Sequence, residues 1–341
     1  MSGDYYSETK LLLSALRGKK VLFLSHARPD LDTLASAYVL AHIFGQQASC
    51  TWGTCEKLND SYTQRVSSFT IQPNVIASLS SYDVLVCVDF RSPAQAGPLV
   101  NELKKFSGNI VIIDHHSPST NEFSGRVLKL IHPSRASTAQ LVAQFGRELG
   151  ADFIKPVSAA LAMGILTDSA KFTVADAETF STFSFLLEKS GQSYEQLVER
   201  AIPPLEIADT VAAFHALRQS KLVSVGKYLL ASTNAPYHNA RSANALIQLG
   251  ADVALGIFPS DEGLFCAVRI SNRGHSVLQL DATKILPAIA REHGGTCGGH
   301  PRAAQLNLPP YLSENIILDT FTHELQRRVK KMDKKASVKI Y

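Results

Sequence analysis

Residues 109–116 read Asn-Ile-Val-Ile-Ile-Asp-His-His, an apolar run that ends in an acid and two imidazoles. Similar apolar runs at residues 20–25 and 83–88 also lead into acidic residues. Continuous runs of Val, Ile and Leu are typical of parallel strands that helices cover on both faces. Because ligands bind beyond the carboxyl ends of strands in open α/β sheets, the sequence predicts one crevice lined by acids and imidazoles.

Six residues near the ends of buried-looking segments are candidate metal ligands. They are His26, Asp30, Asp32, Asp89, His115 and Asp168. Helix capping alone could explain a single aspartate, since Asp is a favoured cap. It does not explain two aspartates and a histidine after one buried strand, and an acid beside two imidazoles is costly to bury without a ligand. The pattern therefore points to a two-metal hydrolase.

The composition is typical of a globular protein, with 45% hydrophobic and 19% charged residues among 341. This length favours two domains over one. The net charge of +4 is too mild for a protein that coats DNA. Much of the excess lies in residues 327–339, where we expect a solvated helix end or a frayed terminus rather than a phosphate-binding surface.

The five cysteines form no C-x-x-C pair, which argues against a zinc ribbon. Their odd number and the lack of a signal peptide favour a reducing cytoplasm. No apolar stretch is long enough to span a membrane. We therefore expect a cytoplasmic protein without a membrane partner.

The order of patterns along the chain predicts two α/β domains. Strand and helix patterns alternate through about residue 150, as in βαβ units, and residues 1–190 are expected to form a parallel-sheet domain. Residues 191–220 are expected to form a helical linker. Strand patterns return in residues 221–330, a smaller α/β domain, and residues 331–341 are a basic tail.

Residues 137–140, Ser-Thr-Ala-Gln, predict the start of a helix. In such a capping box Ser137 caps the helix and Gln140 bonds back to it. A contact between a substrate phosphate and Ser137 or Thr138 stays open as an alternative.

The chain resembles the DHH phosphoesterases, in particular the subgroup with a C-terminal DHHA1 domain. Four motifs carry the resemblance in order: His26, Asp30, Asp32 and Ser36; Asp89; Asp114, His115 and His116; Gly164-Ile165 with Thr167-Asp168 and Phe172. Residues 294–302 are similar to the Gly-Gly-His loop of DHHA1, so the resemblance covers nearly the whole chain. The first motif departs from the family at Leu31, where glycine is usual.

The resemblance implies two Mn²⁺ ions, and ligand type leaves Mg²⁺ and Co²⁺ open. The implied ligands are His26, Asp30 and Asp89 for one ion, and Asp32, Asp89, His115 and Asp168 for the other. His116 would contact the scissile phosphate or protonate the leaving oxygen, and Asp114 would orient an imidazole.

In the second domain the resemblance implies a substrate-binding surface. Its expected residues are Arg273, Gly298, Gly299, His300 and Arg302. The glycines would let backbone N–H groups approach a phosphate. Arg273 is preferred to Arg269 as the arginine that binds substrate.

The implied function is a manganese-dependent phosphodiesterase that cleaves short single-stranded RNA or DNA and dinucleotides to mononucleotides. A 3′-phosphatase reaction on 3′,5′-bisphosphate nucleotides is also implied. The enzymatic alternatives are a RecJ-like single-strand exonuclease and a cyclic-dinucleotide phosphodiesterase. A nucleotide-binding regulatory protein is the non-enzymatic alternative, although such a protein should have lost ligands. A homodimer is a further expected partnership.

Overall fold

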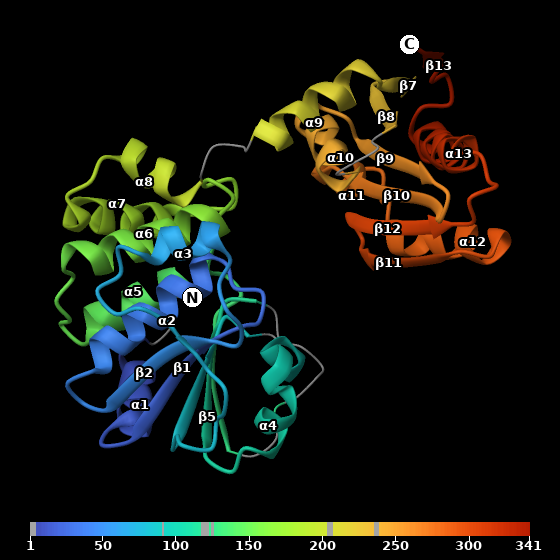
Figure 1. Ribbon diagram of the computed structural model, residues 1–341. Helices are drawn as coiled ribbons and strands as arrows, with labels where there is room; N and C mark the ends of the chain where they lie inside the picture. The colour runs from blue at the N-terminus through green and yellow to red at the C-terminus, as the bar shows by residue number, and fades with distance from the viewer. Residues whose placement is uncertain (1–4, 91, 117–122, 124–125, 203–206, 235–238) are drawn as a thin grey trace. The chain divides into compact units, whose positions relative to one another are not determined.

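The computed structural model describes residues 5–341 except 91, 117–122, 124–125, 203–206 and 235–238. The chain divides into two compact units, residues 1–204 and 205–341, and each has its own sheet (Figure 1). The predicted fold class, a parallel α/β domain followed by a smaller α/β domain, is confirmed. The expected linker, residues 191–220, is divided: helix α8 (Tyr194–Ala201) belongs to the first unit and helix α9 (Ile207–Arg218) to the second.

The first unit is built on a six-stranded parallel sheet in the order β3-β2-β1-β4-β5-β6. Its strands are β1 (Lys20–Ser25), β2 (Ser49–Thr54), β3 (Asn74–Val75), β4 (Val84–Val88), β5 (Asn109–Asp114) and β6 (Val127–Ile131). The strand order changes direction between β1 and β4. A crevice beyond the carboxyl ends of these two strands is the usual ligand site of such a sheet.

Helices cover both faces of this sheet (Figure 1). The helices of this unit are α1 (Tyr5–Leu16), α2 (Leu31–Phe44), α3 (Asp60–Val66), the 3₁₀ segment η1 (Pro93–Leu99), α4 (Val100–Lys105), α5 (Thr138–Glu148), α6 (Lys155–Asp168), α7 (Ala177–Ser190) and α8. Helices α7 and α8 pack against α6 rather than against the sheet. Successive strand residues point to opposite faces. Val21 and Phe23 therefore join the core beneath α2, α5 and α6, while Leu22 and Leu24 join the core beneath η1 and α4.

The second unit contains a seven-stranded mixed sheet in the order β11-β12-β10-β9-β8-β7-β13. Its strands are β7 (Lys221–Val225), β8 (Tyr228–Asn234), β9 (Val253–Ser260), β10 (Gly263–Ile270), β11 (Thr296–His300), β12 (Ala303–Leu308) and β13 (Val338–Ile340). Its helices are α9, α10 (Asn239–Gln248), α11 (Asn272–Ser276), α12 (Ala282–His293) and α13 (Asn315–Met332).

The basic tail follows the prediction only in part. Helix α13 ends at Met332 with Lys330 and Lys331 in its last turn, as expected of a solvated helix end. The terminus beyond it is not frayed, because β13 pairs in antiparallel fashion with β7. Among the described helices, none is long and apolar enough to cross a bilayer.

Candidate metal centre

The six predicted ligands lie together in the first unit, beyond the carboxyl ends of its strands. Asp89 directly follows β4, and His115 directly follows β5. With their neighbours in sequence they form three groups whose ligand atoms lie within 4.8 Å of one another. The groups are His26, Asp30 and Asp89; Asp32, His115 and Asp168; and Asp89, Asp114, His115 and His116.

Asp89 is the residue that connects these groups. Its Oδ2 atom lies 3.6 Å from Nε2 of His26, and its Oδ1 atom lies 3.8 Å from Nε2 of His115. The side chain is only 3% exposed, and the residue has a left-handed backbone with φ of 62°. Aspartate tolerates that conformation better than most residues. The two oxygens of one buried carboxylate thus face two different sets of ligands.

Asp32 is held by the start of α5. Its Oδ2 and Oδ1 atoms accept hydrogen bonds from the backbone N–H groups of Thr138 (2.7 Å) and Ala139 (2.8 Å). The hydroxyl of Thr138 also donates to Oδ1 of Asp89 at 3.0 Å. Gly164 lets α6 approach, since a Cβ there would lie 2.9 Å from Cβ of Ala139 and 3.2 Å from Oδ1 of Asp32.

The capping prediction at the start of α5 is half right. Ser137 is the cap, and its hydroxyl accepts from the N–H of Gln140 at 3.1 Å. The side chain of Gln140 bonds to the N–H of Ala136 at 3.2 Å, one residue before the cap, so the reciprocal bond is not made to Ser137. Thr138 contacts two carboxylates, a role that sequence reasoning missed although the capping signal located the helix terminus.

His115 presents its Nε2 atom to the carboxylates because its other nitrogen is engaged. Nδ1 lies 3.0 Å from the carbonyl oxygen of Arg135 and must donate to it, since a carbonyl can only accept. Nε2 is buried and makes no hydrogen bond, although it lies 2.9 Å from Oδ2 of Asp168. Two atoms that both face one metal ion would lie this close without forming a hydrogen bond to each other. A carbonyl that fixes the outer nitrogen is a usual companion of a metal-binding histidine.

The Arg135 carbonyl is itself held in place by buried contacts. The guanidinium is 6% exposed, forms an ion pair with Glu178 of α7, and lies over the ring of Tyr5 of α1. Sequence reasoning missed this residue, because no local signal links position 135 to a histidine 20 residues earlier.

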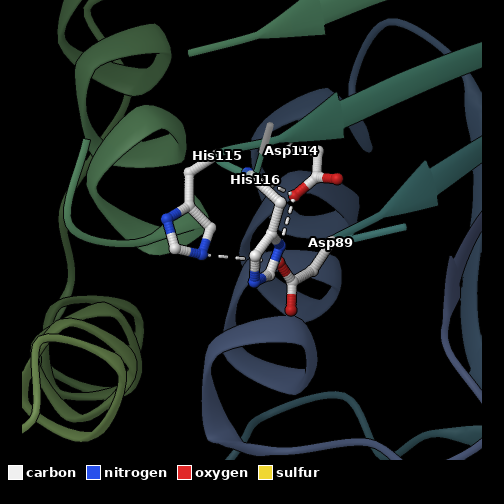
Figure 2. A group of neighbouring side chains, drawn as sticks. All are labelled: Asp89, Asp114, His115 and His116. Atoms are coloured by element: carbon white, nitrogen blue, oxygen red, sulfur yellow. Dashed lines mark hydrogen bonds and ion pairs between the residues drawn. The ribbon is translucent and has the colours of Figure 1, made fainter. Parts of the chain in front are cut away.

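His116 lies beside two carboxylates (Figure 2). Its Nδ1 atom is 2.8 Å from Oδ1 of Asp114 and 3.3 Å from Oδ1 of Asp89. Its backbone N–H also donates to Oδ1 of Asp114 at 3.0 Å. Asp114 therefore orients the His116 imidazole, and the ring is 26% exposed. This placement leaves Nε2 of His116 on the side away from the Asp114 carboxylate.

The pKa values show an excess of negative charge at this centre. Burial, and after it the charge of Asp89, raises the pKa of Asp30 and that of Asp32. Burial disfavours the charge of Asp89 too, but contacts with His116 and His26 hold its pKa below the usual range. Contacts with nearby carboxylates outweigh burial and raise the pKa of His115 to about 9.

The residues of this centre fit divalent cations. Within the described part of the chain, no lysine or arginine forms an ion pair with Asp30, Asp32, Asp89 or Asp168. Buried carboxylates need a countercharge, and Nε2 of His115 faces Asp168 and Asp89 without forming a hydrogen bond to either. Oxygen and imidazole ligands without thiolate suit Mn²⁺ and Mg²⁺ better than a soft metal.

Comparison with known families agrees with this centre. The sequence matches the DHH family, N-terminal domain, over residues 20–165, and the DHHA1 domain over residues 229–331. The chain belongs to the DHH/DHHA1 phosphoesterase family.

Relatives of known sequence support this assignment over most of the chain. An uncharacterised protein of Methanocaldococcus jannaschii is 24% identical over 311 residues, which cover 87% of this chain and 90% of that protein. The cyclic-di-AMP phosphodiesterase GdpP of Geobacillus thermodenitrificans is 24% identical over 84% of this chain and 45% of its own length. A solved structure of an exopolyphosphatase-related protein from Bacteroides fragilis has a TM-score of 0.68 at 18% identity, covering 95% of this chain and 96% of that one.

The glycine-rich segment of the DHHA1 domain forms a hairpin of β11 and β12 rather than an irregular loop. Gly299 has φ of 135°, and a Cβ there would lie 2.5 Å from the carbonyl oxygen of Ala303. A hollow of about 500 Å³ lies against the hairpin and is lined in part by Gly298, Gly299 and Arg269. His300 is exposed at the end of β11 and is not among the lining residues.

The contacts of the arginines do not support the preference for Arg273 over Arg269. Arg273 lies in the short helix α11, where Nε and Nη2 each lie 2.7 Å from an oxygen of the fully buried Asp252. Arg269 lies on β10, donates to Oδ1 of Asn244 and to the carbonyl oxygen of Val268, and lines the hairpin hollow. Arg302 donates to the carbonyl oxygen of Ile270 and to the side chain of Asn272. A buried acid that the sequence pattern does not reveal thus engages the predicted substrate arginine.

Proposed function

We propose that this chain is a metal-dependent phosphodiesterase that hydrolyses short single-stranded oligonucleotides and dinucleotides to mononucleotides, with Mn²⁺ as its ion. The observation that carries the proposal is the position of Asp89, whose two oxygens face two ligand groups. One carboxylate between two ions is the arrangement that two-metal phosphoryl chemistry needs.

The proposed ligands are the six residues predicted from the sequence. His26, Asp30 and Asp89 would hold one ion, and Asp32, Asp89, His115 and Asp168 would hold the other. When bound, such a pair lowers the pKa of water and offsets negative charge on phosphoryl oxygens. The N–H groups at the start of α5 fix the Asp32 carboxylate, and the Arg135 carbonyl fixes the ring of His115.

His116 is the proposed catalytic residue that contacts the scissile phosphate or protonates the leaving oxygen. Asp114 holds its Nδ1 side, so the Nε2 side can approach a substrate oxygen. A general acid must lie within hydrogen-bond reach of the oxygen that it protonates, and the partial exposure of this ring permits that approach.

The proposed substrates are small because the basic charge of the chain is mild. Nucleoside 3′,5′-bisphosphates would be further substrates. The hairpin hollow of the DHHA1 domain, with Arg269 and the backbone of Gly298 and Gly299, is the proposed binding surface for a remote part of the substrate.

Cyclic dinucleotides are a second candidate substrate class. The similarity to GdpP of Geobacillus thermodenitrificans, a cyclic-di-AMP phosphodiesterase, extends over 311 residues and includes both domains of this chain. That breadth favours a related phosphodiester substrate.

A substrate panel tests the proposal. The protein is incubated with Mn²⁺ and with 5′-labelled RNA and DNA of about 2 to 20 nucleotides, a range that includes the ~4–16-nucleotide sites of single-strand binders. Nucleoside bisphosphates and cyclic dinucleotides are tested in parallel. We expect dinucleotides to tetranucleotides to be cleaved faster than 20-mers. A clear preference for long strands with processive shortening would replace the proposal with a RecJ-like exonuclease.

A further inference from the structure

The DHH domain contains a hollow of its own, distinct from the hairpin hollow of the DHHA1 domain. None of its lining residues is a predicted metal ligand or substrate residue. It has a volume of about 390 Å³ and lies between the loop that follows β1 and the loop that follows β2. We call it the loop hollow. Its lining includes Arg28, Pro29, Glu56, Lys57, Leu58 and Tyr62.

The topology of the sheet brings the two loops together. Strands β1 and β2 are parallel neighbours, so both loops leave the same edge of the sheet. Arg28 and Lys57 are each the third residue after their strand. The thiol of Cys55 donates to the carbonyl oxygen of Ser25 at 3.2 Å and joins the bases of the loops. The two cations are therefore placed by a fixed part of the fold.

The loop hollow adjoins the first group of candidate ligands. Arg28 lies in the segment between His26 and Asp30, both of which belong to that group. Pro29, the residue before Asp30, lines the same hollow as Tyr62. Arg65, one turn further along α3, lies over the Tyr62 ring at 4.8 Å from its centre and holds it in place. A substrate bound at the metal centre would thus have its next group close to this hollow.

The two cationic side chains of the loop hollow have no partner among the described residues. Arg28 and Lys57 are exposed and have no ion pair or side-chain hydrogen bond with any residue that the structure describes. The Glu56 side chain also lines the hollow, so two cations face one acid among its lining residues. Two unpaired cations beside an acidic centre have the charge needed to attract an anionic group.

We propose that the loop hollow binds a second phosphate group of the substrate, next to the scissile phosphate, through Arg28 and Lys57. This inference rests on the proposed function and narrows its substrates to nucleotides with at least two phosphates, such as 5′-phosphorylated dinucleotides and nucleoside 3′,5′-bisphosphates. Arginine binds phosphate through its planar fork and lysine binds it as a point charge. The half-buried ring of Tyr62 gives the adjoining sugar an apolar surface.

The test is the double variant Arg28→Ala/Lys57→Ala in the full chain. Its matched control is Lys19→Ala/Lys105→Ala, which removes the same charge from exposed positions that precede β1 and β5, at the opposite ends of the strands. KM is measured with Mn²⁺ for a 5′-phosphorylated di-adenylate and for the same dinucleotide without that phosphate. The affinity of each protein for adenosine 3′,5′-bisphosphate and for adenosine is measured separately by calorimetry.

We expect the test variant to lose its preference for the phosphorylated dinucleotide by roughly 10- to 100-fold, the usual effect of removing charge-assisted contacts. The control should keep the preference. An equal rise of KM for both dinucleotides, an equal effect in the control, or no effect would each overturn the inference. If no phosphodiester is cleaved but only the test variant binds the bisphosphate more weakly, the subsite stands and the proposed function fails. If dinucleotides are cleaved and removing both cations changes neither KM, the proposed function stands and the subsite fails.

Discussion

Asp32 and Asp252 are both completely buried, one in each domain, and they obtain their countercharge differently. Asp252 receives two bonds of 2.7 Å from the guanidinium of Arg273 and one from the N–H of Leu229. Among the described residues, Asp32 accepts hydrogen bonds only from backbone N–H groups, and it lies near other acids. Because an uncompensated buried charge is very costly, we expect the DHH domain to bind an external cation where the DHHA1 domain supplies its own.

The two sites differ in whether their buried polar atoms have partners within the protein. This difference distinguishes a candidate metal site from a structural ion pair. At Asp252 every strong acceptor has a partner within the domain. At the candidate metal centre Nε2 of His115 lies 2.9 Å from Asp168 but forms no hydrogen bond with a residue that the structure describes, and the two oxygens of Asp89 face two groups. The same residue type therefore indicates function in one domain and stability in the other.

The largest expected effect comes from the shared carboxylate. Asp89→Ala should abolish hydrolysis of a small activated phosphodiester and lower bound metal at both groups, because one side chain serves both. Metal analysis after gentle purification and a rate assay with added Mn²⁺ measure the two effects. Asp152→Ala, an exposed acid of the same domain, is the control. Full activity of Asp89→Ala with added Mn²⁺ would rule out the bridging role.

Sequence patterns were sufficient to predict which candidate ligands lie together, because the residues that follow parallel strands lie at one edge of the sheet. His26, Asp89 and His115 each follow a buried strand, as the sequence pattern around each of them predicts. The supporting contacts could not be predicted in the same way. Asp32 contacts Thr138 across 106 positions of sequence, and His115 is held by a carbonyl whose identity depends on the path of a loop.

The DHHA1 domain was harder to predict for the same physical reason. The strand patterns predict a sheet in this domain, and the structure contains that sheet. The contacts of each arginine depend instead on where β10 ends: Ser271 caps α11, and Arg273 in that helix contacts Asp252. Neither the cap nor the buried acid has a spacing that singles it out.

The next largest effect separates a ligand from a catalyst within one motif. His115→Ala should lose metal, since its Nε2 atom faces Asp168 and Asp89. His116→Ala should keep metal and lose rate by about 10²–10⁴-fold, the usual contribution of a general acid. Metal content and kcat are measured on both variants. Metal loss confined to His116→Ala would exchange the two assignments.

Metal removal should weaken only the domain that needs an external cation. Trp52, the single tryptophan, is buried in the DHH domain, so its fluorescence follows that domain alone. Chelation should lower its unfolding temperature, because an ion at 100 times its Kd stabilises the folded state by about 2.7 kcal/mol. A second unfolding transition, seen by far-UV circular dichroism and due to the DHHA1 domain, should keep its midpoint temperature. A Trp52 transition that is unchanged after confirmed metal removal would mean that the buried acids are satisfied without an ion.

The smallest expected effects compare Arg273 with Arg269. Arg273→Ala leaves Asp252 buried without its cation, which costs about 3–5 kcal/mol when both partners are buried. Arg273 is 47% exposed, so water can replace part of its charge and we expect a loss of about 1–3 kcal/mol of unfolding free energy. Arg269→Ala should change stability less and should raise KM for dinucleotides more, because this side chain lines the hairpin hollow. Urea unfolding and dinucleotide kinetics on both variants give the comparison, with metal content as the control for the DHH domain. If Arg273→Ala instead raises KM without loss of stability, the Arg273–Asp252 pair opens to receive substrate, and Arg273 is the substrate arginine that the sequence predicts.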